Sequence, residues 1–407
     1  MTDPRHIVIA GSGLAGASAA AAVRERGFAG TVTLFGQDRY RPYELPALSK
    51  GVLLGDTDHP DWVHDEGSYR EHDIELRTSS RITQLRADEQ IVVDSDGSTH
   101  HYDRLLLATG SKPRHLPVPG GDRPALLTLR TLDDANALRT RLVAGARVVI
   151  VGAGWIGCEV AAAARHHDAQ VTVVEPLALP LHRVLGTTIG EVFRDLHAEH
   201  GVDWRLGVGV SGFQAQDGGT ELVRLADGTE LLADVVVVAV GAAPDVTLAK
   251  EAGLTIAQDG GVAVDAALRT SVPQIYAAGD IASHAHPRYG HPVRVEHWSN
   301  AKDQGTHVAG ALLGDEQPYT ASPYFFSDQY DLGLEYRGLA DPEHDELVVR
   351  GDLATREFIA FWLADGRVRA ALNVNSWDDG DALGALVDNA VEASAEQLRE
   401  ADLSTLG

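Results

Sequence analysis

The sequence predicts an α/β protein with two similar parallel-sheet units, each carrying an inserted β-meander, and a C-terminal α+β domain. Residues 6–23 and 147–164 share one pattern: an apolar run of strand length, the motif G-x-G-x-x-G and a helix rich in small residues. A second strand, a meander with an Asp-Gly turn and an apolar run ending in glycine follow each copy. The first two units are therefore expected to be Rossmann-like.

The repeat can be followed element by element. In the first copy, the second strand, the meander turn and the closing run are residues 31–35, Asp96-Gly97 and residues 105–110. In the second copy, the corresponding segments are residues 170–174, Asp227-Gly228 and residues 235–241.

The region after about residue 319 has a different pattern. Residues 358–364 and 367–373 predict a hairpin around the two-residue turn Asp365-Gly366. A closing helix is expected from about Asp381 to Leu398.

Each glycine of the repeated motif has its own physical role. The first permits a tight turn, the second lets the backbone approach a pyrophosphate, and the third lets the helix pack close to the strand. The helix N-terminus then offers free N–H groups and its positive dipole end to phosphates. Two copies in this context predict two dinucleotide sites. The predicted contacts are Gly11, Gly13, Leu14, Ala15, Gly16, Ala108, Thr109 and Gly110 in the first copy and Gly152, Gly154, Trp155, Ile156, Gly157 and Gly241 in the second.

The residues after the second strands suggest which nucleotide each copy binds. An acidic residue about 20 positions after the glycines usually binds a ribose hydroxyl. In the second copy this residue is Glu175, whose carboxylate would repel a 2′-phosphate, so NADH is predicted rather than NADPH. In the first copy Gln37 or Asp38 could take this role, and the sequence does not choose between them.

A later segment assigns the first copy to FAD. A strand followed by Gly279-Asp280 at a helix start can place a carboxylate near a ribityl chain or pyrophosphate, as in flavoproteins that bind two dinucleotides. Non-covalent FAD is therefore predicted on the first copy and NADH on the second. The predicted domains are residues 1–113 and 241–318 for FAD, residues 114–240 for NAD, and residues 319–407 for the C-terminal domain.

Composition narrows the function classes. A formal net charge of −25 argues against nucleic acid, which requires a basic surface. The one cysteine, Cys158, excludes an internal disulfide or dithiol pair, and the histidines show no metal-site spacing. No apolar run approaches the ~20 residues of a membrane span, and no secretory signal precedes the strand at Ile7. A cytoplasmic protein without a membrane or nucleic-acid partner is expected.

Several motifs resemble the FAD-dependent ferredoxin reductases that serve haem-thiolate monooxygenases and Rieske dioxygenases. The resemblance covers nearly the whole chain. The segments that carry it are Pro42-Tyr-Glu-Leu-Pro46-Ala-Leu-Ser-Lys50, Leu129-Arg130-Thr-Leu-Asp133-Asp, residues 152–159, Val293-Arg-Val-Glu296-His-Trp298-Ser-Asn and Tyr324-Phe-Phe-Ser-Asp328-Gln-Tyr. The sequence departs from the family at Gln37, where an acid is usual, at Leu45, where arginine is frequent, and at Ala47, where proline is common.

The resemblance implies roles for individual residues. Lys50 would lie beside the flavin near N5, Glu159 near the nicotinamide carboxamide, and Trp298 against the pyrimidine side of the flavin; these three are the predicted catalytic residues. Asp280 would hold the ribityl diphosphate. The further implied FAD contacts are Pro46, Ile82, Arg130, Glu296 and His297, and the further NAD contact is Arg183.

The activity that the resemblance implies is hydride transfer from NADH to FAD, followed by single-electron transfer to a [2Fe–2S] ferredoxin that feeds a monooxygenase or dioxygenase. The chain would be a monomer or a homodimer. Because both proteins would be acidic, docking is expected to depend on a local arginine patch or on apolar contact. Two alternatives remain: an NADH oxidase or NADH:quinone reductase, and a redox-sensing flavoprotein that acts as an interaction partner.

Overall fold

The computed structural model describes residues 4–407, which form two compact units. Unit 1 contains the chain up to Glu44, Asp61–Lys112 and Ala242–Ala321. Unit 2 contains Leu45–Pro60, Pro113–Gly241 and Ser322–Gly407. Each unit has its own hydrophobic core.

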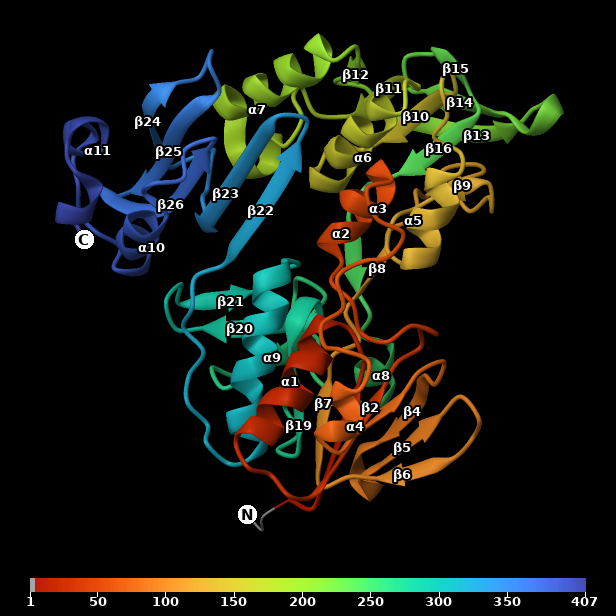
Figure 1. The fold of residues 1–407 in the computed structure, drawn as a ribbon, viewed down its shortest axis with the longest axis vertical. Coiled ribbons are helices and arrows are strands. Elements are labelled where there is room, and N and C mark those ends of the chain that lie inside the picture. The colour runs from red at the N-terminus through yellow and green to blue at the C-terminus, as the bar shows by residue number, and fades with distance from the viewer. Residues whose placement is uncertain (1–3) are drawn as a thin grey trace. The chain divides into compact units, whose positions relative to one another are not determined.

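Unit 1 is built on a five-stranded parallel sheet in the order β19-β7-β1-β2-β3. Its strands are β1 (His6–Ala10), β2 (Thr31–Phe35), β3 (Ile74–Arg77), β7 (Arg104–Leu107) and β19 (Ile275–Ala277). Helices α1 (Leu14–Glu25) and α9 (Trp298–Leu312) lie side by side in Figure 1. They approach closely because Gly305 has no side chain: a Cβ there would lie 2.3 Å from the carbonyl oxygen of Ala15.

Unit 1 also contains two three-stranded sheets, of which the first is antiparallel and the second is mixed. The meander consists of β4 (Ile82–Arg86), β5 (Ile91–Asp94) and β6 (Thr99–His101), with the predicted turn at Asp96-Gly97. The other sheet contains β18 (Val262–Val264), β20 (Ala282–His286) and β21 (His291–Val293). The short elements are α4 (Ser68–Glu71), α8 (Thr247–Glu251), η1 (Ala87–Glu89) and η3 (Gly279–Ile281), and β8 (Ser111–Pro113) pairs with β17 (Ala242–Pro244).

Unit 2 repeats this plan with a five-stranded parallel sheet in the order β12-β11-β10-β16-β9. Its strands are β9 (Leu126–Leu127), β10 (Arg147–Val151), β11 (Gln170–Glu175), β12 (Asp203–Leu206) and β16 (Val235–Val238). Its meander is β13 (Val210–Ala215), β14 (Glu221–Leu225) and β15 (Glu230–Ala233). Its helices are α2 (Pro46–Ser49), α3 (Gly51–Leu54), α5 (Leu132–Arg139), α6 (Trp155–His166) and α7 (His182–Glu199), with η2 at Asp217–Gly219.

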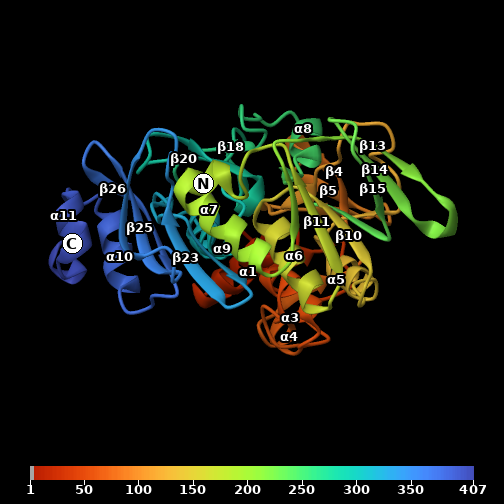
Figure 2. The same ribbon diagram turned by 90° about the horizontal axis from the view of Figure 1, so that it is seen from above.

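The C-terminal part of unit 2 is a five-stranded antiparallel sheet in the order β22-β23-β26-β25-β24 (Figure 1). Figure 2 labels β23, β25 and β26 and shows the helix α10 (Gly380–Asp388) beside β26. Its strands are β22 (Tyr324–Gln329), β23 (Leu332–Gly338), β24 (Glu346–Asp352), β25 (Glu357–Ala364) and β26 (Arg367–Val374). The predicted hairpin turn is present, and both Asp365 and Gly366 have the positive φ that a tight turn requires. One set of buried side chains packs with α6 and α7, and another packs with the helices at the end of the chain. The predicted fold class is confirmed.

The single closing helix expected from Asp381 to Leu398 is wrong. The chain forms two short helices there, α10 (Gly380–Asp388) and α11 (Ala395–Glu400), followed by η4 (Leu403–Thr405). Ala390 has a φ of 44°, which ends the first helix, and Glu392 forms an isolated bridge with Arg367. Ser394 then caps α11 by accepting a hydrogen bond from the amide of Gln397.

Within residues 4–407, no helix is both long enough and apolar enough to cross a membrane.

Candidate functional site

The first glycine motif of unit 1 forms a close-packed turn between β1 and α1. Gly11 has a φ of +117°, and a Cβ at Gly16 would lie 1.9 Å from the carbonyl oxygen of Gly11. A Cβ at Gly13, in contrast, would meet no atom within 4 Å. Gly13 is also the N-cap of α1 and has no side-chain cap, so the helix amides face an open space. This cradle fits a dinucleotide pyrophosphate.

The Gly279-Asp280 segment lies beside this cradle in unit 1. A Cβ at Gly279 would be 3.1 Å from the Cβ of Ala15, in the first turn of α1. The Gly279 amide donates to Gln304 Oε1 over 2.9 Å, and Arg294 donates to the carbonyl oxygen of Asp280 over 3.2 Å. The two predicted FAD motifs are therefore neighbours in space although more than 260 positions separate them in the chain.

The two candidates for the FAD ribose differ in their surroundings. The Asp38 carboxylate accepts the hydroxyl of Tyr43 over 2.8 Å and the amide of Tyr40 over 3.2 Å. Gln37 is exposed. Asp38 is half-buried, so Gln37 is the more accessible of the two candidates.

Other predicted FAD residues of unit 1 lie at ends of elements. Thr109 donates to the carbonyl oxygen of Asp245 over 2.7 Å, just after β7. Ile82 starts β4 and is buried in the core.

His297 is the N-cap of α9. Burial lowers the pKa of its ring to about 4, and Asp280 opposes this effect. Trp298 follows His297, with Lys302 Nζ 5.0 Å from its ring centre. Glu296 accepts a hydrogen bond from Arg294, and Ala108 and Gly110 flank Thr109 after β7.

The second glycine motif, in unit 2, repeats the geometry of the first. A Cβ at Gly157 would lie 2.1 Å from the carbonyl oxygen of Gly152, and one at Gly154 would meet nothing within 4 Å. Gly154 is an N-cap without a side-chain cap, so the amides of α6 are available to a phosphate. Trp155 packs on Phe325, with ring centres 4.6 Å apart, whereas Ile156 is exposed.

Glu175 lies against this second cradle. Its Oε2 accepts the amide of Ala153 over 2.8 Å, and its Oε1 accepts the amide of Leu177 over 3.0 Å. The carbonyl oxygen of Ala153 in turn accepts the amide of Leu181. The predicted contact Arg183 is exposed in the first turn of α7. A carboxylate at this place matches a ribose site. Gly241, with a φ of +89°, follows β16.

A buried ion pair forms the polar centre of unit 2. Lys50 Nζ lies 2.8 Å from Glu159 Oε1, and the two side chains are 18 % and 7 % exposed. Ser49 donates to Glu159 Oε2 over 2.5 Å, and Ser327 donates to Oε1 over 2.6 Å. The carboxylate of Glu159 therefore has three donors. The Phe326 ring lies 5.3 Å below Lys50 Nζ.

This cluster also affects Asp328, the next residue after Ser327. Burial raises the pKa of the Asp328 carboxyl, with Glu159 raising it further and Lys50 lowering it.

Three of the predicted FAD contacts, Pro46, Lys50 and Arg130, belong to unit 2 rather than to unit 1. Pro46 starts α2, and the Arg130 amide donates to Asp134 over 3.0 Å just before α5.

Cys158 has a structural environment. Its side chain is fully buried, and burial raises the pKa of its thiol, so the reactive thiolate is disfavoured. Its Sγ lies 3.7 Å from the carbonyl oxygen of Ala153. Within the part of the chain that the structure describes, no three His, Cys, Asp or Glu residues come together as a metal site.

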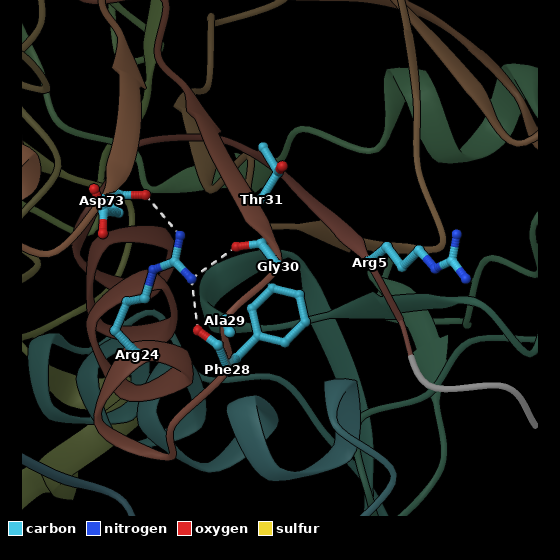
Figure 3. A pocket seen from close by; sticks show the side chains of 7 residues that line it. All are labelled: Arg5, Arg24, Phe28, Ala29, Gly30, Thr31 and Asp73. Atoms are coloured by element: carbon cyan, nitrogen blue, oxygen red, sulfur yellow. Dashed lines mark hydrogen bonds between the residues drawn. The ribbon is translucent and has the colours of Figure 1, made fainter.

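A pocket in unit 1 does not match either cradle (Figure 3). It lies where β1 and β2 begin, whereas dinucleotides bind at the carboxyl ends of parallel strands. Arg24 points into it, but its guanidinium donates to the carbonyl oxygens of Phe28, Gly30 and Asp73 over 2.6–2.8 Å. The other lining residues are Arg5, Ala29 and Thr31.

The sequence predicted Glu159 as a site residue but did not single out Ser49 or Ser327, which donate to it. Ser49 and Ser327 lie in the two most distinctive motifs, but only the fold brings them to one carboxylate. The available signal was the alternation of Ser327 and Gln329 along β22, which places both side chains on one face of the sheet.

The fold and the two cradles define an oxidoreductase that binds two dinucleotides. The chain belongs to the pyridine nucleotide-disulphide oxidoreductase family, which matches residues 5–305, and residues 324–406 match the reductase C-terminal family. The predicted resemblance is confirmed, and so are the predicted cofactors FAD and NADH.

Named relatives cover nearly the full chain. Putidaredoxin reductase of Pseudomonas putida is 38 % identical over 91 % of this chain and 88 % of its own length. The ferredoxin–NAD(+) reductase component of the anthranilate 1,2-dioxygenase system of Burkholderia cepacia is 39 % identical over 98 % and 97 %.

Solved structures of other proteins share this fold. The covalent putidaredoxin reductase–putidaredoxin complex has a TM-score of 0.94 at 35 % identity and covers 100 % of this chain and 98 % of that chain. A water-forming NADH oxidase from Lactobacillus brevis has a TM-score of 0.87, covers 99 % of this chain and 97 % of that chain, but at 19 % identity shares the fold alone.

Proposed function

We propose that this protein is an NADH-dependent ferredoxin reductase that serves a monooxygenase or a Rieske dioxygenase. When bound, FAD would supply the redox chemistry, which is to accept a hydride from NADH and to pass its two electrons on singly. The net reaction of NADH with two oxidised [2Fe–2S] ferredoxin molecules would give NAD⁺, one proton and two reduced ferredoxins. The protein contributes binding, orientation and electrostatics.

One observation carries this proposal: two uncapped glycine cradles occur in a chain whose single cysteine is buried. The cradles favour two dinucleotides. The lone buried thiol leaves no dithiol to receive the electrons, so they must pass to an external acceptor. The named relatives are reductases of ferredoxins, which favours a ferredoxin over another acceptor.

On the FAD side, the α1 amides after Gly13 would bind the pyrophosphate, and Asp280 would bind the ribityl diphosphate. Gln37 is the better candidate for the ribose, because it is exposed, whereas Asp38 is half-buried. The uncharged amide of Gln37 can accept and donate to the ribose hydroxyls. Trp298 would lie against the flavin, and Lys50 would stabilise negative charge on the reduced ring.

On the NADH side, the α6 amides after Gly154 would bind the pyrophosphate and Glu175 the adenosine ribose. Glu159 would bind the nicotinamide carboxamide. Three donors already contact this carboxylate, which keeps it from rotating freely. The remaining predicted contacts and the three-domain division stay predictions, as do the cytoplasmic location and the choice between monomer and homodimer.

Rapid mixing under anaerobic conditions tests the proposal. The purified protein should be yellow, NADH should bleach the flavin band, and cytochrome c reduction should require an added [2Fe–2S] ferredoxin. Full-rate oxygen consumption without ferredoxin would favour an NADH oxidase, and full-rate quinone reduction would favour a quinone reductase. Slow reduction of every acceptor would favour a redox-sensing interaction partner. Colourless protein after correct folding would refute all of these.

The salt dependence of the ferredoxin step tests how the partner docks. Because the chain carries a net charge of −25, long-range attraction to an acidic ferredoxin is not expected. Charges beyond ~10 Å are screened at 0.1 M salt. Apolar docking predicts a rate that changes little with ionic strength, whereas a steep loss with added salt would indicate a local basic patch.

A further inference from the structure

A chain of hydrogen bonds runs through the interior of unit 2 and ends on Glu159. Ser327 Oγ lies 2.6 Å from Glu159 Oε1, and Gln329 Nε2 lies 3.1 Å from Ser327 Oγ. Gln329 Oε1 lies 2.9 Å from His197 Nε2, and the Tyr330 hydroxyl lies 3.2 Å from His197 Nδ1. Five side chains from α6, α7 and β22 and its turn are thus linked in series.

The middle of this series of hydrogen bonds is inaccessible to water. His197 is 0 % exposed, and Ser327 and Gln329 are each 1 % exposed. The apolar neighbours of α7 and the C-terminal sheet surround them. Burying polar groups costs free energy unless they are hydrogen-bonded, and an apolar set of the same volume would pack here at lower cost. Their presence therefore calls for a role beyond stability.

The direction of every hydrogen bond in the chain follows from the carboxylate at its end. A carboxylate only accepts, so Ser327 must donate to Glu159 and use its own lone pair to accept from the Gln329 amide. The amide oxygen of Gln329 then accepts from His197 Nε2–H. Burial lowers the pKa of His197 to about 4, so near neutral pH its ring is uncharged, and Nδ1 accepts from the Tyr330 hydroxyl.

We infer that Ser327, Gln329 and His197 are positioning residues that hold the Glu159 carboxylate in a single orientation toward the carboxamide of the bound nicotinamide. This inference rests on the proposed function. The chain acts by fixing donors and not by moving a proton, because the primary amide of Gln329 would have to tautomerise to pass one on. Each donor points toward Glu159, so a change at His197 is transmitted to the carboxylate.

The carboxylate has room for one further donor. Each carboxylate oxygen offers about two acceptor positions. Lys50 and Ser327 use both positions of Oε1, and Ser49 uses one position of Oε2. The remaining position on Oε2 suits the N–H of a carboxamide.

Binding measurements on the oxidised flavoprotein test this inference without turnover. Calorimetry compares NAD⁺ with ADP-ribose, which lacks the nicotinamide. Ser327→Ala should weaken NAD⁺ about tenfold, the effect of one hydrogen bond to a charged group, and leave ADP-ribose unchanged within about twofold. Ser327→Thr keeps the hydroxyl and should restore NAD⁺ binding.

His197→Phe tests the transmission along the chain. Phenylalanine keeps an aromatic ring beside Trp204 but removes the donor to Gln329. The amide of Gln329 can then turn over and accept from Ser327, which withdraws the hydroxyl from Glu159. NAD⁺ binding should weaken about threefold and ADP-ribose binding should not change. Equal binding of NAD⁺ by the wild type, Ser327→Ala and His197→Phe would overturn the inference.

Matched controls separate this inference from a general loss of structure and from failure of the proposed function. Ser322 donates to Asp388 rather than to Glu159, so Ser322→Ala should bind both ligands like the wild type. If Ser327→Ala or His197→Phe lost ADP-ribose binding together with NAD⁺ binding, the whole unit would be damaged, and this result would also overturn the inference. If the wild type bound neither ligand, the proposed function itself would fail.

Discussion

The two glycine cradles share their backbone geometry but differ in the side chains beside them. The Gly11 amide donates to Phe35 over 2.9 Å, and the Gly152 amide donates to Val174 over 2.8 Å. Strand register makes Gly36 the counterpart of Glu175, and Ser12 the counterpart of Ala153. In unit 2 the Glu175 carboxylate accepts the Ala153 amide; in unit 1 a Cβ at Gly36 would lie 1.9 Å from Ser12 Oγ.

This difference shows how one supersecondary unit can bind two different nucleotides. The backbone provides the pyrophosphate cradle in both units, so the glycines do not distinguish FAD from NADH. The two units differ in their side chains at this place, because unit 1 has Ser12 and Gly36 where unit 2 has Ala153 and Glu175. Unit 1 adds Asp280 from a distant segment, and unit 2 adds Glu159 from α6, where α1 has Ser18.

The largest expected effect comes from adding one methyl group to the third glycine of either cradle. Gly16→Ala would place a Cβ 1.9 Å from a backbone oxygen in unit 1, and Gly157→Ala would place one 2.1 Å away in unit 2. Overpacking of this kind costs about 1–3 kcal/mol, which corresponds to roughly five- to 140-fold if it falls wholly on cofactor affinity.

The two alanine variants should fail differently. Gly16→Ala should purify with little flavin absorbance, whereas Gly157→Ala should keep its FAD and bind NAD⁺ poorly in calorimetry. Loss of FAD from Gly157→Ala with normal FAD in Gly16→Ala would reverse the assignment of cofactors.

The sequence was sufficient to predict the cradles but not the side chains that complete the site. A strand, three glycines and a small-residue helix are local features, and their repetition reveals the paired sheets. The hydrogen bond between Ser327 and Glu159 joins residues 168 positions apart, so no local pattern could predict it. The break at Ala390 was missed because Leu383, Leu386 and Val387 have helical spacing before it, and no glycine or proline stands between Asp388 and Ser394 to mark a stop.

A smaller effect is expected from changing the residue that distinguishes the two strand ends. Glu175→Gln removes the negative charge and keeps one oxygen that can accept the Ala153 amide, while the Leu177 amide loses its acceptor. Without the repulsion of a 2′-phosphate, the preference for NADH over NADPH in rapid-mixing reduction rates should fall about tenfold.

Gln37→Glu is the matched control for this experiment. It adds the family's usual acid in unit 1, where it should affect FAD affinity and leave the NADH to NADPH ratio unchanged. A shift of that ratio by Gln37→Glu alone would mean that the nucleotide assignment of the two units is wrong.

The smallest effect is expected in the response of the two units to acid, which should be of the same kind in both. Burial lowers the pKa of five histidines in unit 1 and of His197 in unit 2. Those of unit 1 are His6, His64, His284, His286 and His297. The folded-state pKa of both His284 and His197 falls to about 4.

Because these rings are neutral when folded, the unfolded chain binds more protons below its own histidine pKa of about 6.5. Stability is therefore fully present above about pH 6.5 and is lost as the pH falls toward 4. Each buried histidine should cost about 1.4 kcal/mol per pH unit in this range. Differential scanning calorimetry at pH 7.0 and 5.5 should show a smaller acid-induced drop in Tm for His284→Gln and His197→Gln than for the wild type. His291 is exposed, so His291→Gln should show the wild-type drop, and an equal drop in all four proteins would mean that burial of these rings does not control the acid response.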